Sequence, residues 1–353
     1  MSSKEYPLLP LFEKFIRFSY SGNRLKPDGS RIKRQTVDNY VYVLRYLKEY
    51  ECKYALVLRV RVMTGYNKRT HATERNYWKK FYKQFTDFLY VEKNCFDNYV
   101  GNVVKVLRIF FHFLNKDLLI PTGDYYKSFY VCKEEVPIVT LLPAQLQFLI
   151  CDAAFEKSLS ISLQKAKDIF VFGCTVGLRV SDLFSIKFND VERVNQVVYL
   201  PVKTIKTGAQ VRIKLPDYAV AIIDKFKRAA KGRKCIFPPI PRTRFNNQIK
   251  EIAALAGWTK DVGRQRTKRG LCNKSILRKD GQPYRFCDLI SSHTMRRTAI
   301  TTMLMYGMKE CVVRKISGHS DGSKSFHRYV NLVQSYVDNE VDMVFNSLVR
   351  ADS

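Results

Sequence analysis

Apolar side chains recur at helical spacing through the first third of the chain. The segment that begins at Thr36, a suitable N-cap, places Val37, Tyr40, Leu44 and Leu47 three or four positions apart. Two later stripes have the same period: Trp78, Phe81, Phe85, Phe88 and Leu89, and then Val103, Val104, Leu107, Phe110, Phe111 and Leu114. Because this spacing already places the aromatic rings on one helix face, we expect a core rather than a base-stacking surface. The pattern predicts an all-helical domain over residues 1–125.

The pattern changes after Pro121. Residues 126–138 lack helical periodicity and follow turn residues, which indicates a linker. Helical segments return near Pro143, from Ile169 to Gly177, and over 217–230 and 242–257, while residues 197–215 are rich in Val and Ile and break at Thr207-Gly208. We therefore expect a second domain over residues 139–353. Its predicted class is mainly α with a small antiparallel β-sheet.

Composition excludes several classes of protein. The chain is 46% hydrophobic and 26% charged, and no apolar run is long enough to span a membrane. The first residues carry no secretory signal, so a cytoplasmic location without membrane contact is expected. Nine scattered cysteines without a C-x-x-C pair indicate neither a disulfide framework nor a zinc site. No metal and no cofactor is expected.

Charge is the unusual property. Lys and Arg number 61 against 32 Asp and Glu, a net charge of +29. Residues 1–135 hold 25 basic and 14 acidic residues and the remainder holds 36 and 18, so both parts are basic. A polyanion such as double-stranded DNA is the natural partner. Two clusters are candidate DNA-binding residues, with a plain solvated loop as the alternative for each: Lys26, Arg31, Lys33 and Arg34 before a helix start, and Arg264, Arg266, Lys268 and Arg269 in the irregular segment 258–288.

Four short motifs in the second half carry candidate chemistry. They are Gly177-Leu178-Arg179, Lys206-Thr207-Gly208, His293-Thr294-Met295-Arg296, and Gly318-His319 followed by Tyr329. Cleaving a phosphodiester without a metal needs a nucleophile, fixed positive charge for the phosphoryl oxygens, and an acid for the departing oxygen. The guanidinium groups of Arg179 and Arg296 suit the charge, because each can hold two phosphate oxygens in parallel. His293 lies on the helix face of Arg296, and His319 follows a glycine at a helix boundary.

Taken in this order, the motifs resemble the catalytic domain of the tyrosine recombinases, the phage integrase family. The run SSHTMRRTAITTML resembles integrases of Bacteroides-type mobile elements. The resemblance implies a helical SAM-like core-binding domain followed by a mixed α+β catalytic domain. It also implies site-specific cleavage and rejoining of DNA through a 3′-phosphotyrosyl intermediate, without metal or ATP. The implied catalytic residues are Arg179, Lys206, His293, Arg296, His319 and Tyr329.

Some assignments have competitors. Lys206 resembles the lysine that protonates the leaving 5′ oxygen, and Lys203 is its rival. Tyr329 stands one position further from His319 than the family's usual spacing, and Tyr336 is the fallback nucleophile. We expect Tyr306 in the core.

The resemblance also implies a homotetramer on paired DNA sites, association with the nucleoid, and an accessory directionality factor as a further partner. Two other functions stay open. One is strand cleavage without exchange, as in a type IB topoisomerase, and the other is a catalytically inactive DNA-binding regulator with the same fold.

Overall fold

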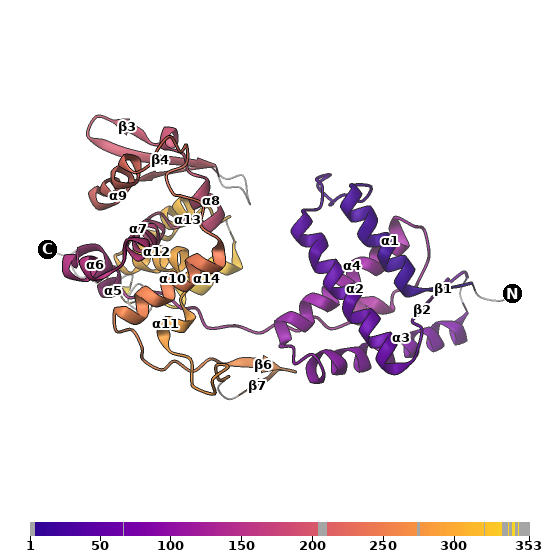
Figure 1. Cartoon of the computed structure of the whole chain (residues 1–353). Coiled ribbons are helices and arrows are strands. Elements are labelled where there is room, and N and C mark those ends of the chain that lie inside the picture. The colour runs from indigo at the N-terminus through magenta and orange to yellow at the C-terminus, as the bar shows by residue number, and fades with distance from the viewer. Residues whose placement is uncertain are drawn as a thin grey trace. The chain divides into compact units, whose positions relative to one another are not determined.

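The computed structural model describes residues 4–65, 67–203, 210–273, 276–320 and 322–333, with single positions at 338, 341, 342 and 345. The chain divides into two compact units (Figure 1). The first comprises Met1–Val136 and Gln265–Ile276, and the second comprises Pro137–Arg264 and Leu277–Ser353. The first unit therefore extends past the expected boundary near residue 126 as far as Val136, and it also contains a short segment from the second half of the sequence.

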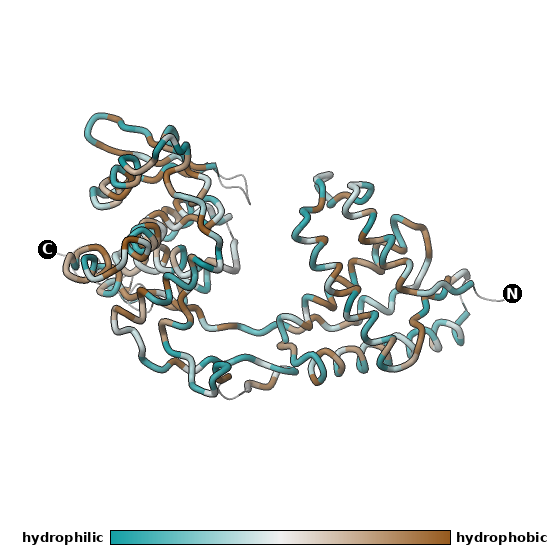
Figure 2. The backbone as a smooth tube through the Cα atoms, viewed as in Figure 1, coloured by the Kyte–Doolittle hydropathy of each residue, from teal (hydrophilic) through white to brown (hydrophobic). Residues whose placement is uncertain are grey.

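The first unit is mainly helical. Its elements are β1 (Glu5–Pro7), α1 (Leu8–Ser21), α2 (Arg34–Tyr54), β2 (Arg59–Arg61), α3 (Lys68–Val91), α4 (Asp97–Lys116), the 3-10 turn η1 (Tyr125–Ser128), β6 (Arg266–Lys268) and β7 (Leu271–Asn273). Brown hydrophobic stretches alternate with teal along the helices in Figure 2, as an amphipathic pattern requires. The predicted stripes do face the core, where Trp78, Phe85 and Phe110 are buried.

Two details of the first unit differ from the sequence prediction. Thr36 is not the N-cap of its helix, because α2 already begins at Arg34 with Lys33 as the capping position. The side chain of Asn67 is a true cap, since its Oδ1 accepts hydrogen bonds from the backbone N–H groups of Arg69 and Thr70 at the start of α3. Residues 125–128, expected in or beside the linker, pack on the core of this unit through Tyr126.

The second unit surrounds the buried helix α7 (Ile161–Val176). Its other helices are α5 (Pro143–Cys151), α6 (Ala153–Ser158), α8 (Val180–Ser185), α9 (Asp217–Arg228), α10 (Arg242–Leu255), α11 (Phe286–Leu289), α12 (Ser292–Met305), α13 (Glu310–Ser317) and α14 (Lys324–Val330), and a 3-10 turn η2 spans Phe188–Asp190. A three-stranded antiparallel sheet has the order β3 (Glu192–Val194), β4 (Val197–Lys203), β5 (Gln210–Lys214). Mainly α with small antiparallel sheets was the predicted class, and the structure confirms it.

Close approach of α7 and α12 fixes the centre of the second unit. A Cβ at Gly173 would overlap the thioether of Met295, so a glycine here lets the two helices pack closely without moving that side chain. This packing places the end of α7 beside the middle of α12. Helices α13 and α14 then pack on the outer part of α12 through a small apolar cluster that includes Ile300, Val313 and Phe326.

Tyr306 is not in this core. The prediction is wrong, because Tyr306 follows the last residue of α12 and its side chain is 75% exposed. Among the described residues, no helix is both long and apolar enough to cross a lipid bilayer.

Candidate catalytic site

The site begins where α7 ends. Gly177 adopts a left-handed conformation (φ 66°), which terminates the helix and turns the chain into Arg179, the N-cap residue of α8. The side chain of Arg179 is half-buried, and its Nη1 is buried without a hydrogen-bond partner among the described residues. A guanidinium can only donate, so this nitrogen lacks an acceptor that a bound anion would supply.

Arg296 lies beside it on α12 and is only 5% exposed. Its Nη1 donates to the carbonyl oxygen of Gly177 at 3.0 Å, while its Nη2 lies 3.1 Å from both ring nitrogens of His319. Burial lowers the pKa of Arg296 to about 10, and the positive charge of Arg179 acts in the same direction. Two cationic side chains in a partly dry site repel each other, and an anion between them would relieve that repulsion.

His319 closes the other side of Arg296. It follows Gly318, a left-handed residue (φ 62°) that ends α13 and turns the imidazole back toward α12. Burial lowers the pKa of His319 to about 4, with added effects from the charges of Arg296, Arg179 and Arg314. The imidazole is therefore neutral at pH 7.

Tyr329 comes from α14 and is half-buried. Its ring centre lies 6.1 Å from that of His319 and 6.4 Å from that of Phe326. Tyr329 is also close enough to Arg296 to favour the charged form of that guanidinium. The structure therefore brings Arg179, Arg296, His319 and Tyr329 together, from four segments that lie up to 150 positions apart in the sequence.

The remaining candidates are placed less centrally. His293 lies one turn before Arg296 on α12 with an exposed side chain. Lys203 is the exposed last residue of β4. Lys206 and Tyr336 lie outside the described residues.

Comparison with known protein families agrees with this geometry. A family model described as "Phage integrase family" matches residues 149–335, more than half of the chain. The chain belongs to the phage integrase family. It is accordingly a tyrosine site-specific recombinase, as the motif order suggested, whereas no comparison tests the Bacteroides-type branch. A search of curated proteins found no match.

Solved structures of other integrases share the fold. A lambda integrase dimer bound to a COC′ core site is 15% identical, with a TM-score of 0.60 over 92% of this chain and 77% of that one. The Tn1549 transposon integrase in complex with transposon right-end DNA is 16% identical, with a TM-score of 0.57 over 92% and 94%. The XerH site-specific recombinase bound to a palindromic difH substrate is 13% identical, with a TM-score of 0.58 over 95% of each chain.

Sequence reasoning missed two residues that contact this integrase site. Ser317, fully buried at the end of α13, has its Oγ 2.8 Å from Nδ1 of His319. Arg314 lies over the ring of Phe326, 4.7 Å from its centre, and pairs with Glu310 one turn earlier. The i, i+4 spacing of Glu310 and Arg314 could have indicated the ion pair, but a lone serine in a last helical turn carries no signal.

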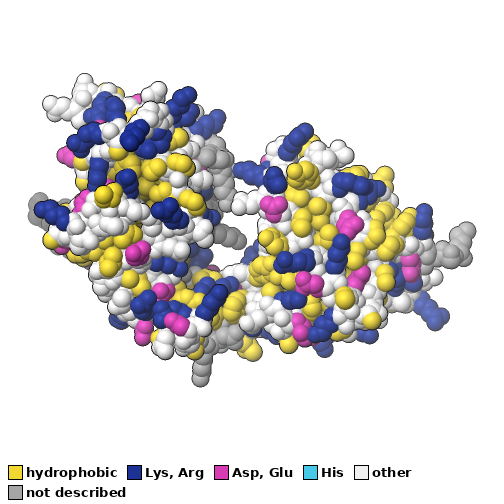
Figure 3. All heavy atoms as spheres, in the orientation of Figure 1, with side chains coloured by type: hydrophobic (Ala, Val, Ile, Leu, Met, Phe, Trp, Pro, Cys, Tyr) yellow, Lys and Arg dark blue, Asp and Glu magenta, His cyan; other side chains and the backbone are white. Residues whose placement is uncertain are grey.

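The first cluster of candidate DNA-binding residues lies on an exposed loop of the integrase. Lys26, Arg31, Lys33 and Arg34 are all exposed, between the end of α1 and the first turn of α2. A bridge from Leu25 to Arg31 closes the loop. Lys and Arg side chains are visible over both units in the space-filling view (Figure 3).

The side chains of the second cluster instead contact other residues of this chain. Arg266 donates two hydrogen bonds to Oε1 of Glu134, at 2.9 and 2.6 Å, and the Glu134 side chain is only 1% exposed. Arg269 pairs with Asp87, and Lys268 bonds the side chain of Asn94. The guanidinium of Arg264, in the second unit, covers the ring of Tyr284.

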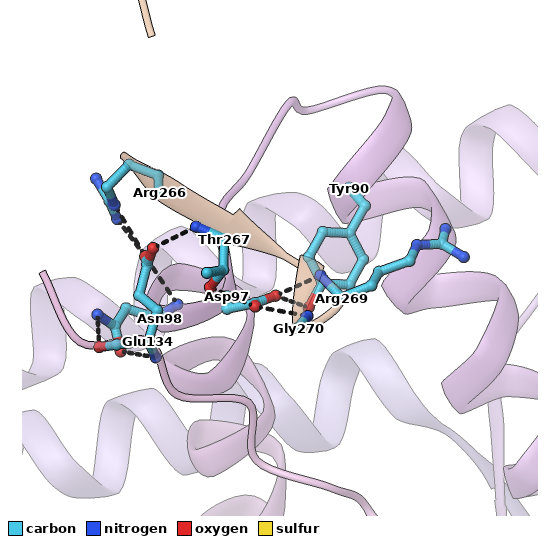
Figure 4. Close-up of polar contacts among 8 residues, drawn as sticks. All are labelled: Tyr90, Asp97, Asn98, Glu134, Arg266, Thr267, Arg269 and Gly270. Atoms are coloured by element: carbon cyan, nitrogen blue, oxygen red, sulfur yellow. Dashed lines mark hydrogen bonds and ion pairs between the residues drawn. The ribbon is translucent and has the colours of Figure 1, made fainter. Parts of the chain in front are cut away.

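Three residues of this cluster belong to the hairpin β6–β7, which the sequence prediction missed. Its tip lies over the N-terminus of α4, where Asp97 is buried (Figure 4). The two carboxylate oxygens of Asp97 accept hydrogen bonds from the hydroxyls of Tyr90 and Thr267 and from the backbone N–H groups of Arg269 and Gly270, at 2.6 to 2.9 Å. Burial alone would raise the pKa of Asp97, but these donors outweigh it and hold that pKa below its usual value.

Proposed function

We propose that this integrase cleaves and rejoins specific sites in double-stranded DNA through a covalent bond between Tyr329 and a 3′ phosphate. Two neighbouring guanidinium groups, one buried and one half-buried, beside a phenol support the proposal. Arg179 and Arg296 carry two fixed positive charges, and one buried donor of Arg179 lacks an acceptor among the described residues. A phosphodiester supplies both the negative charge and the acceptor oxygens.

The proposed reaction uses the phenol of Tyr329, the two arginines, two histidines and a lysine. The phenol of Tyr329 gives up its proton to solvent, its oxygen attacks phosphorus, and the bond to the 5′ oxygen breaks, so that the new phosphotyrosyl ester conserves the bond for rejoining. The arginines stabilise the negative charge that grows on the phosphoryl oxygens during attack. His319, and His293 one turn before Arg296, are further donors to that phosphate. The 5′ oxygen leaves as a hydroxyl by taking a proton from a lysine, for which Lys206 is proposed. This cleavage step uses neither a metal ion nor ATP.

Multimeric action on DNA is part of the proposal. Lambda integrase is known as a tetramer bound to a Holliday junction. We propose by analogy that four copies of this chain join two DNA sites. A directionality factor stays an expectation from the resemblance.

The test is capture of the covalent intermediate. The protein is incubated with a library of nicked duplexes of random sequence, in EDTA and without ATP, and SDS-stable adducts are isolated. We expect a nucleotide on the tryptic peptide that contains Tyr329, identified by mass spectrometry. Tyr329→Phe should bind the library as the wild type does, within about twofold, and form no adduct, because phenylalanine has no nucleophilic oxygen.

Other outcomes point elsewhere. An adduct that persists in Tyr329→Phe, or that maps to Tyr336, contradicts the assignment of the nucleophile. Sequence-selective binding without any adduct supports the inactive regulator. Relaxation of supercoiled DNA without a specific site by a monomer supports the topoisomerase-like alternative.

A further inference from the structure

Helix α3 carries a continuous basic face. Its core-facing side is buried in the first unit through Trp78, Phe81 and Phe85. At 100° per residue, the opposite side presents only basic, polar or small residues, all of them exposed: Arg69, Ala72, Thr73, Asn76, Lys79, Lys80 and Lys83. The face is about 21 Å long from its first to its last cation, at 1.5 Å per residue.

Carboxylates do not neutralise this face within the part of the chain that the structure describes. The helix contains two acidic residues, and both have other partners. Glu74 is buried and pairs with Arg59, while Asp87 pairs with Arg269 of the hairpin β6–β7. The side chains of the four cations form no ion pair with any described residue. Their charge is therefore available to a partner outside the chain.

Unpaired charges at these positions weaken the helix that carries them. Lys79 and Lys83 are four positions apart, and Lys80 and Lys83 are three apart, so their ammonium groups lie on neighbouring turns. Like charges at these spacings destabilise a helix. Helix α2 differs, because its basic residues Arg45, Lys48 and Lys53 each pair with a glutamate. A bound polyanion would replace the repulsion on α3 by attraction.

The composition of the face favours nucleic acid over protein as that partner. Lysine is depleted in protein–protein interfaces, whereas protein–DNA interfaces are polar, wet and positively charged. Among the described residues of this face, no apolar side chain is larger than that of Ala72. Lysine ammonium groups are flexible point charges, which suits contact with phosphates rather than recognition of bases. At 3.4 Å per nucleotide, the face matches about six phosphates of one strand.

The basic face lies far from the exposed loop that holds Lys26 and Arg31. Helix α2 begins beside this loop at Arg34, and Tyr50, near the other end of α2, packs edge-on against Phe81 of α3. Sixteen positions at 1.5 Å each separate these two points by about 24 Å. Figure 1 likewise shows the connection between α1 and α2 at one end of the first unit and α3 at the other.

We propose that the exposed face of α3 is a second DNA-binding surface, which holds the phosphate backbone of a stretch of duplex different from the one at the loop. The proposal rests on the proposed function for its partner, double-stranded DNA, and is independent of the covalent chemistry at Tyr329. Because the two surfaces lie at opposite ends of the unit, both can be occupied at once. One chain then holds two segments of DNA.

The first experiment compares four variants of the full chain. The α3 variant replaces the cations of the face by Ala: Arg69, Lys79, Lys80 and Lys83. The loop variant replaces Lys26, Arg31, Lys33 and Arg34 by Ala, and a third variant combines both sets. The control variant removes four basic residues of the same unit that already pair with carboxylates: Arg45, Lys48, Lys53 and Lys93.

Salt dependence then counts the phosphates that each surface neutralises. Affinity for a fluorescein-labelled duplex of random sequence is measured by fluorescence anisotropy over a range of salt concentrations. The α3 variant should lower the slope of log affinity against log salt by roughly 2 to 3.6, for two to four lost phosphate contacts. The combined variant should lose the sum of the two single effects, because distant sites act additively. Alanine favours helix, so circular dichroism should show an unchanged fold.

The second experiment tests whether the two surfaces hold different DNA. Thr36→p-benzoylphenylalanine beside the loop and Asn76→p-benzoylphenylalanine in the middle of the α3 face place two photo-crosslinkers on one chain, at exposed positions. Short duplexes of random sequence that carry two different dyes are mixed with this protein and irradiated. We expect chains that are crosslinked to two duplexes, one of each dye.

The outcomes separate this proposal from the proposed function. A salt slope of the α3 variant equal to that of the control variant overturns the second surface, and so do chains that never carry more than one duplex. Additive slopes and doubly crosslinked chains without any covalent adduct at Tyr329 refute the proposed chemistry and leave the second surface standing. An adduct at Tyr329 with an unchanged slope in the α3 variant does the reverse.

Discussion

Arg296 shows how one side chain organises the site. Its two terminal nitrogens bind different segments, one at the end of α7 and one after α13, so the guanidinium joins parts of the chain that are distant in sequence. A lysine could not make both hydrogen bonds in this geometry, because it carries a single ammonium group. Burial lowers the pKa of its neighbour His319, and the charge of this guanidinium adds to that effect. Burial lowers the pKa of both groups, but only that of His319 falls below neutral pH, so a charged guanidinium and a neutral imidazole lie side by side.

The lowered pKa of His319 makes stability depend on pH. The unfolded chain binds this proton near pH 6.5, while the folded chain binds it only near a pKa of about 4. Between these values the unfolded state holds more protons, so stability is fully present above pH 6.5 and is lost as pH falls toward 4. We expect the midpoint of thermal unfolding, followed by circular dichroism, to fall between pH 7 and pH 5. The fall should be smaller in His319→Gln.

The other strongly shifted acidic group acts at lower pH. Glu156, whose pKa is held at about 2 by hydrogen bonds from Lys167 and Lys225, affects stability only below its unfolded value of 4.5. His112→Gln, an exposed position on α4, is the matched control and should keep the wild-type dependence on pH. An unchanged dependence in His319→Gln would show that His319 is not the group responsible.

Among the elements, the hairpin β6–β7 depends most on a single residue. Asp97 accepts four hydrogen bonds, three of them from the hairpin, so Asp97→Asn would place an NH2 donor against N–H donors. Leaving such groups unpaired costs about 2–3 kcal/mol, which corresponds to a roughly 30- to 160-fold rise in the open population. We expect trypsin to cleave the hairpin, at Arg266, Lys268 or Arg269, faster by about that factor.

Asp87 provides the comparison for this prediction. It pairs with Arg269 of the same hairpin, but both side chains are exposed, 40% and 51% respectively. Exposed ion pairs contribute little, so Asp87→Asn should leave the cleavage rate within about twofold of the wild type. Equal rates in Asp97→Asn and the wild type would mean that the carboxylate does not hold the hairpin.

The hairpin β6–β7 could not be predicted from patterns in the sequence. Helices such as α3 and α4 were predictable, because their apolar stripes repeat with the helical period over several turns. The strands β6 and β7 are three residues each, lack alternation of apolar and polar residues, and find their partners Asp97 and Glu134 more than 130 positions away. The order of motifs predicted Arg179 and Tyr329 as members of one site, and the structure places both near Arg296 and His319. No sequence pattern predicted Ser317, because its contact with His319 depends on a turn at Gly318 that only the folded backbone shows.

At the scale of the whole molecule, positive charge divides between residues that pair with carboxylates and residues that do not. The chain passes between its two units three times, at 136/137, 264/265 and 276/277, and arginines of the basic segment between the last two crossings pair with carboxylates of the first unit. The net charge of +29 therefore does not measure how many side chains can bind DNA. The exposed loop that holds Lys26 and Arg31 is the better candidate for binding phosphate.

Salt dependence of DNA binding tests this distribution. Replacing Lys26, Arg31, Lys33 and Arg34 by Ala should reduce the slope of log affinity against log salt by up to about 0.9 for each phosphate that the variant no longer neutralises. Affinity for a random-sequence duplex is measured by fluorescence anisotropy from about 50 to about 200 mM salt, a range over which several neutralised phosphates change affinity by orders of magnitude. The matched control removes four basic residues of the same unit that already pair with carboxylates: Arg45, Lys48, Lys53 and Lys93. That control should change the slope little. Equal reductions in both variants would mean that total charge, rather than the position of unpaired charge, governs DNA binding.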